Sequence, residues 1–127
     1  MKSGIYKITN DITGKFYIGS AKDIDWRWYV HKHDLRTSTH RNPKLQHSWN
    51  AHGEDKFSFS IIEDVEPDQT KLFEREQYYL DTLKPYVRGM GYNISPKADG
   101  GDNITHHPNR DAFIIAEAEY LKTLSAQ

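Results

Sequence analysis

The sequence contains no cysteine, which excludes both a disulfide framework and a zinc site built on thiolates. Apolar residues make up only 36% of the chain, and no run of them approaches the roughly 18 residues of a membrane-spanning helix. Met1 leads into a strand-like segment without the apolar core of a secretory signal. We therefore expect an intracellular, cytoplasmic protein with no membrane partner.

Excess charge of either sign is also missing, because the formal net charge of the 127 residues is -1. The charge is nevertheless unevenly distributed. Residues 1–53 hold nine Lys and Arg against four Asp and Glu, whereas residues 54–127 hold eight against fourteen. Such a chain can present one cationic face to a polyanion while staying near neutral as a whole. Ordinary surface variation explains the asymmetry equally well.

Aromatic residues are plentiful, at 13% of the chain, and supply large side chains for the core of one compact domain. Two of the runs that carry them, residues 4–10 (GIYKITN) and 15–20 (KFYIGS), flank a segment with the composition of a hairpin turn. Tyr6 and Ile8 share one face of the first strand, and Tyr17 and Gly19 share one face of the second. If the register places Tyr6 and Tyr17 on the same side, the hairpin displays two phenols together.

Capping signals mark the helices. Asp23 predicts the N-cap of a helix that runs to about Leu35, and Asn42-Pro43 opens a second helix that stops at Gly53. Residues 56–63 alternate as a third strand. Pro67-Asp68 precedes a third helix of about 15 residues that ends before Pro85.

Beyond residue 88 the sequence is irregular apart from a short extended segment at residues 92–94 and a polar loop at 99–109. A last helical pattern covers residues 111–124. The order β-β-α-α-β-α predicts an α+β domain, a three-stranded sheet covered by helices. We place the domain at residues 1–98, with a C-terminal loop and helix extension at 99–127.

Two groups of residues suggest chemistry. Arg27 and His31 stand four apart and therefore share a helix face; a guanidinium binds phosphate oxygens bidentately, and a histidine can shuttle a proton. Glu76 lies in an apolar stripe of the third helix, where a carboxylate needs a partner. A divalent cation such as Mg²⁺ is one candidate, and a salt bridge to Arg27 or a lysine is the other.

The tripeptides Gly4-Ile5-Tyr6 and Tyr17-Ile18-Gly19 resemble the two signatures of the GIY-YIG nuclease superfamily. The later landmarks follow in order and spacing, over roughly residues 1–108: Arg27, His31, His40, Glu76 and Asn93. The opening segment is most similar to the N-terminal catalytic domains of phage and bacterial intron-encoded homing endonucleases. The resemblance implies a three-stranded antiparallel sheet flanked by helices, and a metal-dependent endonuclease that hydrolyses DNA in a bacterial or phage-infected host cell.

The resemblance also implies roles. Glu76 would hold one divalent cation, Mg²⁺ or Mn²⁺, and Arg27 a non-bridging phosphate oxygen. Tyr6, Tyr17 and His31 are the candidates for activating water, with Tyr6 favoured as base. His40 would contact phosphate or a nearby water, and Asn93 would brace the site. Gly4 and Gly19 complete the motif, and we expect both to be glycine because of the backbone at these positions.

Three functions stay open at this point. The first is a DNA endonuclease like the homing enzymes, whose separate DNA-targeting domain we expect to be absent from this chain. The second is a structure-selective repair or restriction nuclease on the same fold, because a fold does not set its substrate. The third is a catalytically silent module that only binds nucleic acid. The oligomeric state is not predicted.

Overall fold

The computed structural model describes residues 2–98 and 110–125. Three strands, β1 (Gly4–Asn10), β2 (Phe16–Ala21) and β3 (Phe57–Asp64), form one antiparallel sheet in the order β2-β1-β3. The helices are α1 (Ile24–Arg36), α2 (Pro43–His52), α3 (Gln69–Leu83) and α4 (Arg110–Ser125), and a 3-10 turn, η1 (Glu54–Lys56), precedes β3. This order and the antiparallel sheet confirm the predicted α+β fold.

The predicted capping residues begin the helices. The side chains of Asp23, Asn42 and Asp68 accept hydrogen bonds from the backbone N–H groups of Trp26, Leu45 and Lys71. Each bond satisfies one of the donors that a helix leaves unpaired in its first turn. The predicted helix boundaries therefore agree with the structure to within one or two residues.

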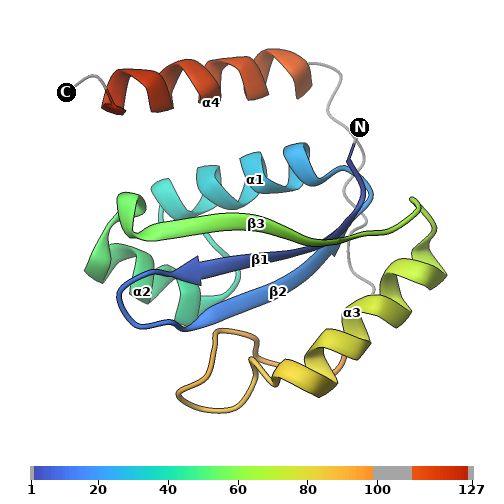
Figure 1. The fold of residues 1–127 in the computed structure, drawn as a ribbon. Coiled ribbons are helices and arrows are strands. Elements are labelled where there is room, and N and C mark those ends of the chain that lie inside the picture. The colour runs from blue at the N-terminus through green and yellow to red at the C-terminus, as the bar shows by residue number, and fades with distance from the viewer. Residues whose placement is uncertain (1, 99–109, 126–127) are drawn as a thin grey trace.

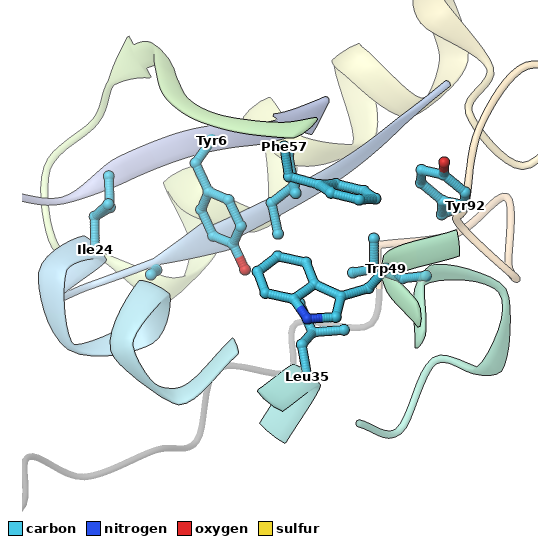
Figure 2. Packing of buried hydrophobic residues seen from close by; sticks show 9 residues of the cluster. Tyr6, Ile24, Leu35, Trp49, Phe57 and Tyr92 are labelled. Carbon is cyan, nitrogen blue, oxygen red and sulfur yellow. The ribbon is translucent and has the colours of Figure 1, made fainter. Parts of the chain in front are cut away.

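The sheet buries both of its faces. Tyr6 and Ile8 point toward α1 and α2, where they pack with Leu35, Leu45 and Trp49. Figure 2 shows this cluster gathered between the strands and the helices. Ile5 and Ile18 point to the other face and pack against Leu72 and Leu80 of α3. The alternation of a strand thus supplies two cores, one on each side of the sheet.

Helix α4 lies over the outer side of α1, away from the sheet (Figure 1). The ring of Phe113 stacks on Tyr29 with centroids 5.5 Å apart and lies 6.1 Å from Trp26. Arg36 forms ion pairs with Glu117 of α4 and with Glu54 of η1. The hydrogen bonds that Arg36 donates to Glu54, followed by those it donates to Glu117, raise the pKa of Arg36 above its ordinary value, so this cation stays charged.

The segment after α3 borders the free edge of β2. It forms no strand of its own within the described residues, and a parallel bridge joins Phe16 to Gly91. The side chain of Asn93 occupies the place of a paired strand, because its amide accepts from the N–H of Ile18 (2.9 Å) and donates to the Ile18 carbonyl (3.0 Å). The predicted loop at 99–109 lies outside the described residues.

Candidate active site

A cleft of about 420 Å³ opens beside strand β2, which lies at one edge of the sheet. Its lining comes from β1, β2, α1, α3 and the segments at 40–42 and 93–97. All seven residues predicted as catalytic line this one cleft: Tyr6, Tyr17, Arg27, His31, His40, Glu76 and Asn93. The cleft is reached from both faces of the sheet, since Arg27 and His31 lie on α1 and Glu76 lies on α3.

The two tyrosines stand on the same side of the hairpin. Tyr6 is opposite Gly19 in the antiparallel register and Tyr17 is opposite Ile8, which places the phenol rings 6.4 Å apart. The Tyr6 ring crosses directly over Gly19. A Cβ at Gly19 would lie only 2.5 Å from Cζ and Oη of Tyr6, so only glycine leaves room for the Tyr6 phenol in this position.

Gly4, the other glycine of the motif, acts on the opposite side of β1. A Cβ there would lie 2.1 Å from the carbonyl oxygen of Glu63 on β3. The pairing of β1 with β3 also shifts register at the adjacent Ile5/Tyr6 step. Gly4 therefore allows close approach of two strands and does not line the cleft.

A chain of hydrogen bonds connects the Tyr6 hydroxyl to two histidines. The Tyr6 Oη lies 2.7 Å from Nε2 of His31, and Nδ1 of His31 lies 2.8 Å from Nε2 of His40. The backbone N–H of Asn42 donates to Nδ1 of His40 over 3.0 Å. Both ring nitrogens of each histidine are thus used within the protein.

The backbone N–H of Asn42 sets the direction of every hydrogen bond in this series. Since Nδ1 of His40 accepts, a neutral His40 carries its proton on Nε2 and donates to Nδ1 of His31. His31 then carries its own proton on Nε2 and donates to the oxygen of Tyr6. This assignment follows from the geometry of the bonds, and it makes Tyr6 an acceptor from His31.

The electrostatics keep both histidines neutral. Burial, with the positive charge of Arg27 and the neighbouring His40, holds the pKa of His31 well below its ordinary value. Burial also lowers the pKa of His40, with Arg27 acting in the same direction and Asp34 opposing it. The hydrogen bonds in the direction assigned above require both imidazole rings to be neutral. His40 therefore reaches Tyr6 through His31. His40 also lines the cleft, and its predicted contact with phosphate or water stays a prediction.

Glu76 is the buried carboxylate of the cleft. Its side chain is 6% exposed and lies on α3 between Leu72 and Leu80, while its neighbour Glu74 points to solvent. The hydroxyl of Ser20, on β2, donates to Oε1 of Glu76. A neutral hydroxyl leaves the negative charge of a carboxylate in place, so this contact orients the group without neutralising it.

Within the described residues, no group of three or more His, Cys, Asp and Glu side chains could enclose a metal ion. A cage made wholly of protein ligands therefore does not fit this cleft. One oriented carboxylate on an open cleft does fit Mg²⁺, which binds through one or two carboxylates and keeps several waters for exchange with phosphate oxygens. Glu76 is the residue present for that role.

Two residues that hold the predicted catalytic groups in place were not themselves predicted as site residues. Ser20 orients Glu76, and Asn42 sets the tautomers of the histidines. Asn42 was predicted as a helix cap, and the same residue also donates from its side chain to the carbonyl of Tyr92 (2.7 Å). Sequence alone offers no signal for either pairing, because each joins segments whose approach depends on the tertiary fold. Trp28 packs its ring against Tyr6 and Phe59.

Comparison with known proteins agrees with this geometry. Residues 2–93 match the family described as the GIY-YIG catalytic domain. The chain is 39% identical over 122 residues to "Intron-associated endonuclease 1" of Enterobacteria phage T4, and 39% identical over 62 residues to "Probable intron-encoded endonuclease 1" of Neurospora crassa. These alignments cover 96% and 49% of this chain but only 48% and 19% of the two relatives.

Two solved structures are also similar. A mutant catalytic domain of intron endonuclease I-TevI superposes with a TM-score of 0.70 at 40% identity, over 77% of this chain and 98% of that one. A second structure of the same catalytic domain gives a TM-score of 0.66 at 39% identity, over 74% of this chain and 99% of that one.

No helix in the described part of the chain is long and apolar enough to cross a membrane.

Proposed function

The chain belongs to the GIY-YIG endonuclease family, and on that premise we propose that it hydrolyses phosphodiester bonds of DNA with the help of one divalent cation. The observation that supports the proposal is the convergence of three groups in one cleft: the oriented Glu76 carboxylate, the Arg27 guanidinium and the directed Tyr6–His31–His40 chain.

Glu76 is the residue that would hold the cation, Mg²⁺ or Mn²⁺, with the remaining positions open to water and phosphate oxygens. A bound cation supplies a Lewis acid that neutralises charge on the scissile phosphate and the leaving 3′-oxygen. Arg27 faces the same cleft from α1, and its planar guanidinium suits a non-bridging phosphate oxygen. Tyr17 lines the wall beside Tyr6 and helps to position the attacking water.

Tyr6 is the proposed general base. The Nε2–H group of His31 donates to the Tyr6 oxygen, and a hydrogen bond to the charged form of an acid stabilises that form. In the reaction the phenolate oxygen takes a proton from water, the hydroxyl oxygen bonds to phosphorus, and the bond from phosphorus to the 3′-oxygen breaks. His31 keeps its proton throughout, because a second proton on Nδ1 would oppose the one that His40 donates. The histidines are thus positioning residues.

The test is nicking of supercoiled plasmid DNA by wild type, with Mg²⁺, with Mn²⁺ and with EDTA, compared with three variants. Tyr6→Phe removes the base and is expected to lower kcat by on the order of 10²–10⁴. Glu76→Ala and Arg27→Ala are expected to lose at least about 10²-fold each. Glu74→Ala is the matched control, because Glu74 is an exposed carboxylate on the same helix.

Cation-dependent nicking that survives in Glu74→Ala and disappears in Glu76→Ala supports the proposal. Activity of equal rate in all variants, or full activity in EDTA, contradicts it. DNA binding by folded wild type without any nicking would move the function to a binding module.

A further inference from the structure

A second pocket, of about 350 Å³, lies next to the active-site cleft, and every charged residue among its described lining is basic. We propose that it is a binding site for backbone phosphates of the DNA strand that continues out of the active site. The proposal depends on the proposed function only in naming DNA as the polyanion. The evidence for the pocket itself does not depend on that function. We call it the basic pocket.

Three segments far apart in the sequence form the basic pocket, and each contributes one permanent cation. Lys15 comes from the turn between β1 and β2, Lys44 from α2, and Arg88 from the segment after α3. No Asp or Glu is among the described residues that line it. Within the described chain, none of these three cations forms an ion pair. Three uncompensated positive charges facing one concavity raise the local concentration of anions.

The floor of the basic pocket is built rigidly. Asn10 is fully buried, and its Nδ2 donates to Oγ of Ser48 (2.9 Å) and to the hydroxyl of Tyr92 (3.1 Å). Ser48 and Tyr92 also bond to each other over 2.6 Å. The Asn10 carbonyl oxygen accepts from the backbone N–H of Ile12 (2.9 Å). One buried amide thus ties together the turn, α2 and the segment at 92, which are the walls that hold the cations.

The two concavities adjoin along the chain. Tyr92 lines the basic pocket and the next residue, Asn93, lines the active-site cleft. At the start of α2, Lys44 lines the basic pocket and the N-cap residue Asn42 lines the cleft. Adjacent residues are 3.8 Å apart at Cα, so a nucleic-acid strand that leaves the cleft over this ridge meets the basic pocket within a few nucleotides. The regular negative charge of a backbone matches such a track.

The experiment measures binding of a short DNA duplex to the 127-residue chain in EDTA, by fluorescence anisotropy over a range of salt concentrations. The test variant is the triple K15Q/K44Q/R88Q. The control is K2Q/K71Q/R75Q, which also removes two lysines and one arginine, but from positions that line neither concavity. Circular dichroism verifies that both variants fold.

Each phosphate contact adds about 0.9 to the slope of log K against log[salt], so losing all three contacts lowers the slope by about 2.7. We expect that loss in the test variant and a much smaller change in the control. Equal changes in the two variants, or no change in either, would overturn the proposal. Because the binding assay in EDTA does not measure cutting, failure of the proposed nuclease activity does not affect its result. In Mg²⁺ the test variant is expected to raise KM for DNA and leave kcat unchanged.

Discussion

Substitution of Gly19 by alanine tests whether the position of the Tyr6 phenol limits the reaction. The added methyl group would lie 2.5 Å from both Cζ and Oη of Tyr6, whereas nonbonded carbon atoms pack at about 3.5–4.0 Å. Tyr6 is 1% exposed, so its ring must shift by about 1 Å and cannot swing out into solvent. Such a shift stretches the 2.7 Å bond to His31 beyond a good hydrogen bond.

A misplacement of about 1 Å in a catalytic group costs on the order of 10²-fold in rate, which is about 2.7 kcal/mol in activation free energy. Overpacking also lowers the free energy of unfolding by about 1–3 kcal/mol. The assay is kcat for plasmid nicking at a temperature where circular dichroism shows the variant fully folded. Gly14→Ala is the control, because it strains a turn at φ +78° with nothing near its Cβ. Gly14→Ala should lose stability and keep kcat. A folded Gly19→Ala variant with wild-type kcat would refute the argument.

Two further predictions concern pH and α4. Because the pKa of His31 is depressed in the folded chain, the unfolded chain takes up the proton first as pH falls below about 6.5. The free energy of unfolding should therefore decrease as the pH falls below that value, and it should decrease less in His31→Gln. Urea unfolding of both proteins at pH 7.5 and 5.5 measures this difference. An equal decrease in wild type and His31→Gln would contradict the prediction. Phe113→Ala removes two ring contacts of about 0.5–1.5 kcal/mol each. We expect faster amide exchange in α4 with unchanged kcat, since none of its described residues lines the cleft; unchanged exchange would show that the rings do not hold α4.

Local signals in the sequence predicted the elements of the fold. Asp23, Asn42 and Asp68 each begin a helix, because a short polar side chain at an N-cap acts on backbone groups only a few residues away. The alternation of side chains along a strand placed Tyr6 and Ile8 on one face. This signal is also local, because it depends on residues only two positions apart. The family resemblance then predicted that seven side chains belong to one site, and all seven line the cleft.

Contacts between distant segments could not be predicted in the same way. The bond from Ser20 to Glu76 joins β2 to α3 across 56 positions, and nothing in either local sequence specifies the other. The contact of His31 with His40 depends on the turn after α1, where Ser38 adopts a left-handed conformation at φ 59°. Asn93 was expected to brace the site, but its role in covering the edge of β2 required the strand order.

The edge position of β2 explains how one cleft gathers groups from both faces of the sheet. In a central strand, alternate side chains are separated by the sheet itself, so the Tyr6 face and the Ser20 face would not share a concavity. At an edge, the two faces meet around the open side of the strand. Helix α1 can therefore bring Arg27 and His31 from one face while α3 brings Glu76 from the other. The amide of Asn93 satisfies the N–H and carbonyl of Ile18 there, which leaves the edge closed to strand pairing but open to a phosphate.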